Sequence, residues 1–243
     1  MNKTYRLTLI AGLMAASGIA HADLTNGPDP YAAGKGFDVP HEAAWGGWNR
    51  GDTGTLYAEW DTFVDSSYPG TRTAAPDVGS AGASDAYLSW NSGTFAAGSG
   101  NLYSFSVIEQ FAANIVGSVA SGPLRAVLQF ETVGTLADYA SILLNGIAPT
   151  FTSQTFYDSS YPSSFGNVPL EHYLAYWDLP EAAASYQFTF SSAEHSLSLG
   201  QVALDIGPNT APVSGVPLPA AVWMFGAGLM ALLGVNRKKG LAV

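Results

Sequence analysis

Apolar and polar residues alternate with a period of two along several short stretches of this chain. In residues 56–61, Leu56 and Trp60 fall on one face of such a stretch and Glu59 falls on the other. The same alternation recurs in residues 126–133, 186–191 and 202–206. Antiparallel strands with one face against a core have this period. The pattern predicts an all-β fold.

Further strands are predicted where aromatic and β-branched residues are bounded by Gly, Pro, Asn and Ser. These candidate strands are Ala86–Trp90, Tyr103–Phe111, Tyr139–Leu144 and His172–Leu179. Two stretches could hold a helical turn, Ala112–Val119 and Glu181–Ser185. So many short strands indicate a two-sheet antiparallel β-sandwich of jelly-roll type, with Trp60 and Trp177 in its core.

A short motif occurs twice in the chain. Residues 62–69 read TFVDSSYP and residues 155–162 read TFYDSSYP. The segments between the motifs do not match. Asp and Ser before Pro favour a turn after a strand, so the motif indicates recurrent turn chemistry, and an ancient duplication stays open as the alternative.

The first 22 residues have the pattern of a signal peptide. Lys3 and Arg6 precede an apolar run, and Ala20, His21 and Ala22 form an A-x-A site suited to signal peptidase. We therefore expect the mature chain to begin at Asp23.

The last segment combines a proline pair, an apolar run and a basic tip. The run from Ala220 to Val235 has no charge, and as a helix it would be about 24 Å long, which suits a short membrane span. By the positive-inside rule the basic tip stays cytoplasmic and the chain before Val216 lies outside. An ordinary single-pass anchor is one interpretation.

This tail also resembles the PEP-CTERM sorting signal, in which a Pro-Glu-Pro-like motif precedes a transmembrane helix and a basic tip. Leu218 stands where the family has glutamate, so the motif is a VPLP variant. The resemblance implies a Gram-negative host, an exosortase-type processing enzyme as partner, and delivery to the cell surface or exopolysaccharide matrix, but no activity. The residues that carry it are Val216, Pro217, Leu218, Pro219, Arg237, Lys238 and Lys239.

The chain thus divides into five parts, of which one is a folded domain. We expect a signal peptide (1–22), an extended leader lying over the sandwich (23–44), the β-sandwich (45–207), a linker (208–215) and the sorting signal with its transmembrane helix (216–239). The region 23–215 has four basic and 19 acidic residues, a net charge of −15, which argues against nucleic acid as a partner. With no cysteine, its stability must come from the core alone.

Carboxylates on one predicted strand face give a candidate metal site. Glu59 and Asp61 share that face, and Asp205 lies near the end of the last strand, which often neighbours the first in a sandwich. Converging carboxylate oxygens suit Ca²⁺, the one cofactor that the sequence suggests. The alternative is a solvated acidic face.

Aromatic residues outside the core pattern give a candidate carbohydrate site. Flat aromatic faces can pack against sugar rings, although such residues also seal the ends of sandwiches. The candidate contacts are Trp45, Trp48, Trp90, Tyr68 and Tyr161.

Motifs of catalysis are not found in the sequence. There is no G-x-S-x-G elbow or P-loop, and His41-Glu42 begins a zincin pattern in which Trp45 stands at the second ligand position. We expect an exported, non-catalytic protein with a structural or adhesive role. Two alternatives remain: a carbohydrate-binding module, and a secreted hydrolase whose triad is assembled in space.

Overall fold

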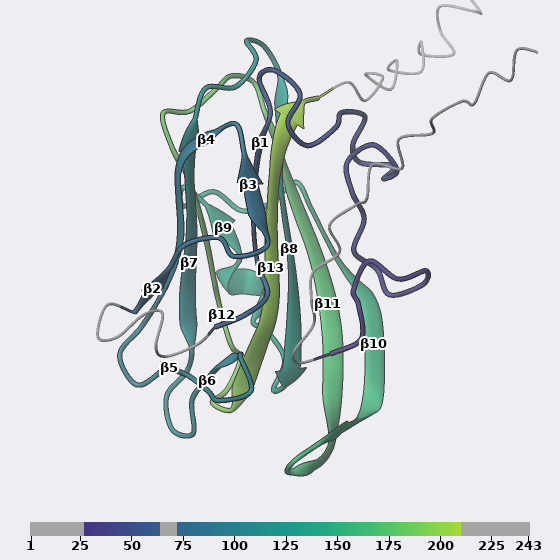
Figure 1. Cartoon of the computed structure of the whole chain (residues 1–243), viewed down its shortest axis with the longest axis vertical. Coiled ribbons are helices and arrows are strands. Elements are labelled where there is room, and N and C mark those ends of the chain that lie inside the picture. The colour runs from purple at the N-terminus through teal and green to yellow at the C-terminus, as the bar shows by residue number, and fades with distance from the viewer. Residues whose placement is uncertain (1–26, 64–71, 210–243) are drawn as a thin grey trace, which may run out of the picture.

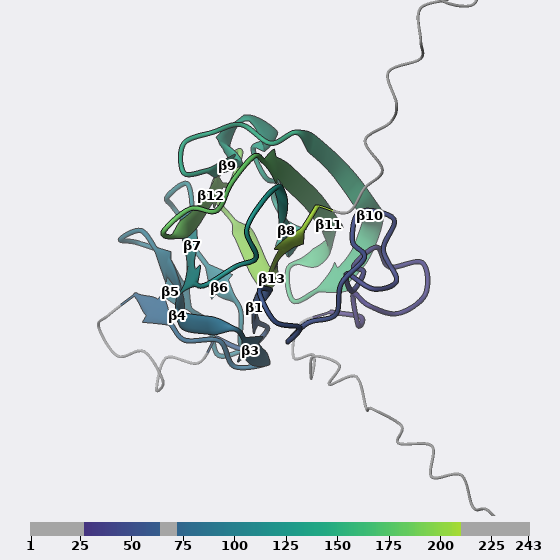
Figure 2. The same cartoon turned by 90° about the horizontal axis from the view of Figure 1, so that it is seen from above.

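The computed structural model describes residues 27–63 and 72–209, which form two antiparallel β-sheets packed against each other (Figure 1). This confirms the predicted all-β fold and its two-sheet arrangement. In the view from above, β4, β7, β12 and β9 lie along one side and β8, β11 and β10 along the other (Figure 2).

The larger sheet, sheet A, contains the longest strands of the described chain. Its strand order is β10 (Phe151–Ser163), β11 (Gly166–Leu179), β8 (Leu124–Gly134), β13 (Leu197–Pro208), β1 (Leu56–Trp60) and β3 (Gly79–Ala81), with β6 (Leu102–Tyr103) beside β13 and β5 (Phe95–Ala96) beside β6. The first and last major strands are neighbours, and Tyr57 lies opposite Asp205.

The smaller sheet, sheet B, has five strands. Its order is β2 (Thr73–Ala74), β4 (Ala83–Trp90), β7 (Gln110–Gly117), β12 (Tyr186–Ser191) and β9 (Leu143–Leu144). Both edges of this sheet are strands of two residues, a length that leaves little free backbone for pairing with another chain.

Large aromatic side chains fill the space between the sheets. Phe130 of sheet A stacks on Phe190 of sheet B, with ring centroids 4.4 Å apart, and Trp177 packs edge-on against Phe188 at 5.4 Å. Trp60 is fully buried and its indole N–H donates to the carbonyl of Ala74. The predicted core positions Trp60 and Trp177 are therefore confirmed.

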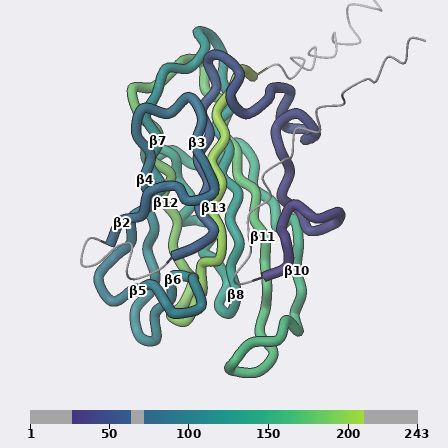
Figure 3. The backbone as a smooth tube through the Cα atoms, viewed as in Figure 1, coloured from purple at the N-terminus to yellow at the C-terminus, as the bar shows by residue number. Residues whose placement is uncertain are grey.

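The N-terminal segment, defined as residues 27–55, covers the outer face of sheet A. It runs in purple beside β10 and β11 in Figure 3 and continues to β1. Trp45 and Trp48 anchor it in a second apolar cluster with Val127 and Leu174. Residues 27–44 of the predicted leader lie over the outer face of sheet A, and the covering segment continues eleven residues beyond Ala44, up to β1.

Four local predictions were wrong. Residues Ala112–Gly117, read as a candidate helical turn, belong to strand β7, because they pair with both β4 and β12. Residues 104–109, within the strand predicted at Tyr103–Phe111, form a loop. Tyr139–Ser141 is the 3-10 helix η2, capped by the Asp138 side chain. The second DSSYP motif, predicted to form a turn after a strand, lies within β10, where the register shifts between Asp158 and Tyr161.

Candidate functional site

Buried polar side chains line the outer face of sheet A, beneath the N-terminal segment. Alternation places Phe130 and Val202 on the core side, so Glu131 and Gln201 point to the opposite side. In a sheet exposed on one side this face would be solvated. Here the N-terminal segment removes it from water, so each polar group needs a partner.

Arg50 joins the N-terminal segment to two neighbouring strands. Its guanidinium donates two hydrogen bonds to Asp205 of β13, each 2.8 Å long, and one of 3.0 Å to Glu59 of β1. Tyr31 accepts a hydrogen bond from Arg50 and donates one to Glu59, and Tyr57 donates to the same Glu59 oxygen at 2.6 Å. We call these five residues the Arg50 clamp.

Burial governs the electrostatics of the clamp. Burial raises the pKa of Glu59, and the Arg50 charge and the hydroxyls of Tyr57 and Tyr31 oppose that rise. Burial alone would lower the pKa of Arg50, but Asp205, Tyr31 and Glu59 together raise it above its usual value. The guanidinium is therefore permanently charged and supplies the positive charge that the two carboxylates need.

The calcium site predicted at Glu59, Asp61 and Asp205 is not formed. Arg50 takes the place of the cation between Glu59 and Asp205, and the hydroxyl of Thr62 donates to Asp61. Within residues 27–63 and 72–209, no group of three or more His, Cys, Asp or Glu side chains could hold a metal ion. The solvated acidic face is also wrong, because Glu59 and Asp205 are each only 1% exposed.

A second buried pair lies on the same face, farther toward β10. His172 Nε2 is 2.7 Å from Glu131 Oε2, and the Nδ1–H donates to the carbonyl of Lys35 in the N-terminal segment. Both side chains are inaccessible to solvent. This pair therefore also fastens the N-terminal segment to sheet A.

A serine, a histidine and a glutamate meet in the loop before β13. His195 Nδ1 is 2.8 Å from the hydroxyl of Ser196, and Glu109 Oε1 accepts from the backbone N–H of Ser196. The other oxygen of Glu109 accepts from the hydroxyl of Ser192 at 2.6 Å. Glu109 thus binds serine groups and not the imidazole, so the order of contacts differs from that of a Ser-His-acid triad.

The tryptophans proposed as carbohydrate contacts are buried. Trp45 and Trp48 belong to the N-terminal segment and point into the apolar cluster that it forms with sheet A, and Trp90 packs edge-on against Phe63 in the core. Tyr161 is half-buried in β10, while Tyr68 lies outside the described residues. These residues do not form one surface, and the three indoles offer no exposed face to a ligand.

A different set of aromatic residues gathers at one end of the sandwich. We call this set the aromatic end: Phe95 in β5, Tyr103 in β6, Phe105 just after β6, and Phe165 in the turn between β10 and β11. Phe105 and Phe165 are 61% and 76% exposed. Tyr103 contacts Phe105 at 4.8 Å between ring centroids and Phe165 at 6.5 Å, so rings from two distant parts of the chain make one patch.

Hydrogen bonds hold the loops of the aromatic end in place. The hydroxyl of Ser104 accepts from the backbone N–H groups of Ser106 and Val107. On the other loop, the hydroxyl of Ser163 accepts from the N–H of Phe165 and donates to the carbonyl of Gly166. The exposed rings are therefore carried on ordered turns.

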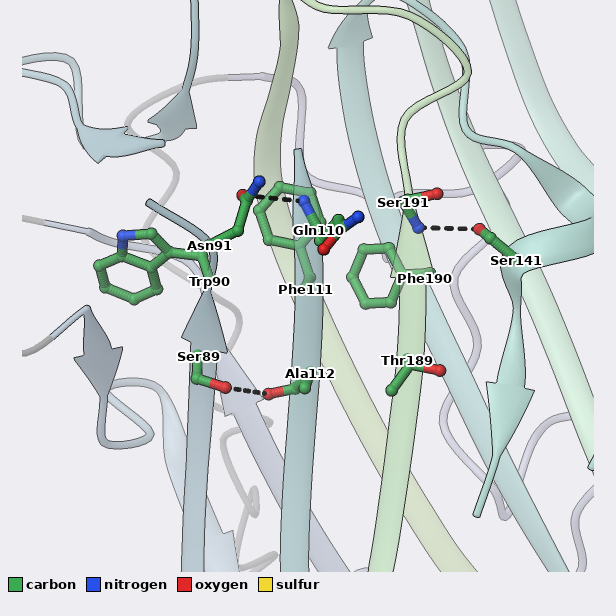
Figure 4. A pocket seen from close by; sticks show the side chains of 10 residues that line it. All are labelled: Ser89, Trp90, Asn91, Gln110, Phe111, Ala112, Ser141, Thr189, Phe190 and Ser191. Atoms are coloured by element: carbon green, nitrogen blue, oxygen red, sulfur yellow. Dashed lines mark hydrogen bonds between the residues drawn. The ribbon is translucent and has the colours of Figure 1, made fainter. Parts of the chain in front are cut away.

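A shallow polar groove of about 430 Å³ opens on the outer face of sheet B. It crosses three strands, and Figure 4 shows its rim of hydroxyl and amide groups above the rings of Phe111 and Phe190. The polar side chains that line it are Ser89, Asn91, Gln110, Ser141, Thr189 and Ser191. None of the lining residues is charged, so the groove suits a neutral, hydroxyl-rich ligand.

The groove and the aromatic end share one connection. Asn91 and Gln110 line the groove, and the chain between them carries three of the four rings of the aromatic end. The Asn91 side chain fixes this connection, because its amide donates to the carbonyl of Ile108 and its oxygen accepts from the N–H of Gln110.

Sequence reasoning missed the aromatic end, although the sequence contains a signal for it. Neither residues 91–108 nor residues 159–170 contain a charged side chain or a histidine, and both contain phenylalanine among Ser, Gly and Asn. In an acidic chain, an uncharged loop with large apolar residues indicates a binding surface. That the two loops meet could not be read from the sequence.

The predicted sorting residues Val216, Pro217, Leu218, Pro219, Arg237, Lys238 and Lys239 lie outside the described residues, as does the predicted signal peptide. Within residues 27–63 and 72–209, no helix is long and apolar enough to cross a membrane. No known protein family, characterised protein or solved structure matches the chain.

Proposed function

We propose that this chain is an exported, non-catalytic protein with a structural or adhesive role at the cell surface or in the exopolysaccharide matrix. The two terminal sequence patterns support export and sorting, with signal peptidase and an exosortase-type enzyme as processing partners. We further propose that the sandwich is jelly-roll-like, and the pairing of its first and last major strands, β1 with β13, supports this.

The observation that carries the adhesive role is the position of the aromatic end. The β10–β11 hairpin and β5–β6 lie at the end of the sandwich opposite to the end at which β13 finishes (Figure 1). A chain tethered through residues after β13 would therefore direct its exposed rings away from the tether. That orientation suits contact with a surface or a polymer outside the cell.

The buried polar side chains beneath the N-terminal segment support a structural role for that segment. Arg50, Glu59 and Asp205 bind one another, as do His172 and Glu131. These groups fasten the N-terminal segment in a chain without cysteine.

Carbohydrate binding is the second candidate function, and the polar groove favours it. Its hydroxyl and amide groups are those that recognise sugar hydroxyls in protein sites. The residues that support this candidate are those of the groove and the aromatic end, in place of the buried tryptophans.

Intact-mass analysis of the protein recovered from the culture matrix tests export and sorting. We expect a species that begins at Asp23 and ends near Pro217–Pro219. Recovery outside the cell of a species that still carries Arg237–Lys239 would contradict processing of the tail, and recovery only from the cytoplasm would contradict export.

A further inference from the structure

The aromatic end and the polar groove together have the chemistry of a binding site for a neutral polysaccharide. We propose that a neutral polysaccharide chain packs on the rings of Phe95, Phe105 and Phe165 and continues into the groove of sheet B. This inference rests on the proposed adhesive function and names its ligand.

The rings supply the apolar part of the site. Phe95 and Phe105 stack with centroids 5.9 Å apart and planes 29° apart, and Tyr103 and Phe165 are nearly parallel at 8°. A sugar ring has an apolar C–H face similar in width to a phenyl ring, so several sugar units can lie across such a patch. Because ordered turns carry the rings, binding loses little conformational entropy.

The groove supplies the hydrogen bonds. Gln110 extends an exposed amide beside Thr189 and Ser191 on the neighbouring strand β12 (Figure 4). Gln110 pairs with Ser191 in the register of β7 and β12, so both side chains lie on the outer face of sheet B. Thr189 is two residues from Ser191 and lies on the same face. The other polar side chains of the groove, those of Ser89, Asn91 and Ser141, already bond within the protein. The amide of Gln110 and the hydroxyls of Thr189 and Ser191 are therefore the groups that match the hydroxyls of a saccharide.

The negative charge of the protein favours a neutral polymer over an acidic polysaccharide, an anionic lipid surface or a second copy of the chain. Residues 23–215 have a net charge of −15, which repels acidic polysaccharides and anionic lipid surfaces. The two loops of the aromatic end contain no lysine or arginine that would attract them. Repulsion between two acidic copies likewise disfavours self-association through this end.

The test measures the affinity of the full chain in detergent for neutral polysaccharides. The panel contains hydroxyethyl cellulose, xylan, galactomannan and dextran, with alginate as the acidic comparison, and affinity is read from retardation in native gels that contain the polymer. We expect at least one neutral polymer to bind and alginate not to bind. Absence of binding to every neutral polymer, or equal binding of alginate, overturns the proposal.

Matched variants locate the site. Phe105→Ser and Phe165→Ser should each lower the affinity by about tenfold, because each removes one stacking surface. Gln110→Ala should lower it by about threefold, because it removes one amide of the groove. Phe151→Ser and Tyr157→Ser, at exposed aromatic positions of β10, should leave it unchanged.

Three results would contradict this assignment. Equal losses in the β10 variants would show general apolar adhesion, and full binding by Phe105→Ser and Phe165→Ser would place the sugar elsewhere. A change of sedimentation without a change of glycan affinity would make the aromatic end an interface between copies. Failure here with correct export and processing in the mass analysis would remove the ligand and leave the proposed sorting intact.

Discussion

At the scale of single residues, Arg50 supplies the positive charge for two buried carboxylates. Arg50 is one of four basic residues between Asp23 and Gly215, and the structure places it between two buried carboxylates. Glu59 and Asp205 are 146 positions apart in the sequence, so only the pairing of β1 with β13 brings them together. Without the guanidinium, both carboxylates would be buried charges with no countercharge.

Arg50→Met should therefore lower the free energy of unfolding by about 3–5 kcal/mol, the usual cost of removing one partner of a buried ion pair. Arg72→Met is the matched control, because Arg72 is exposed, and it should change stability by less than about 0.5 kcal/mol. Denaturant unfolding measures both. Similar, small effects would mean that the Arg50 clamp contributes nothing to stability.

Glu171 should make stability depend on pH. Burial raises its pKa to about 7, and the one hydrogen bond from Gln154 opposes this only in part. Because the folded state holds this proton up to a higher pH than the unfolded state, stability should fall as pH rises from about 4.5 to 7. Glu171→Gln should remove that fall and gain on the order of 2–3 kcal/mol at pH 8.

Unfolding measured at pH 5 and pH 8 in the wild type and in Glu171→Gln checks this. Glu194→Gln, at an exposed glutamate, is the control and should follow the wild type. An unchanged pH dependence in Glu171→Gln would show that Glu171 ionises normally in the folded protein.

At the scale of elements, the period-two pattern predicted the strands that face the core, and it failed where tertiary pairing decides. Strand β7 (Gln110–Gly117) contains Ala112, Ala113 and Asn114 in a row, which indicated a helical turn. Its position between β4 and β12 makes it a strand. The pattern also treated the outer face of β1 as solvated, because a strand does not show what covers it.

The calcium prediction failed because Arg50 of the N-terminal segment lies between Glu59 and Asp205. The prediction of tryptophans as carbohydrate contacts failed because docking of this segment buries Trp45 and Trp48, and because Trp90 lies in the core between the sheets.

Docking of the N-terminal segment depends on a glycine in β13. A Cβ added at Gly207 would lie 2.4 Å from the ring of Trp48, which has no flexible end to move aside. Gly207→Ala should therefore displace Trp48, cost about 1–3 kcal/mol and raise the hydrogen exchange of amides in residues 45–50. Gly98→Ala is the control, because a Cβ there meets nothing within 4 Å. Unchanged exchange in Gly207→Ala would contradict the proposed anchoring by Trp48.

At the scale of the whole molecule, the uncharged aromatic end contrasts with an otherwise acidic chain. The charge and the terminal patterns were evident in the sequence, but the end itself requires β5, β6 and the β10–β11 hairpin to be brought together. If residues after β13 tether the protein, the rings face outward and can hold it to material outside the cell.

The most direct test of this account is the fraction of protein retained in the extracellular matrix after washing. The comparison is between the wild type, the double variant Phe105→Ser with Phe165→Ser, and the control Phe151→Ser with Tyr157→Ser, each expressed as the full chain. We predict that the first double variant is exported normally but retained about tenfold less, while the control is retained like the wild type. Equal retention of all three proteins would contradict adhesion through the aromatic end.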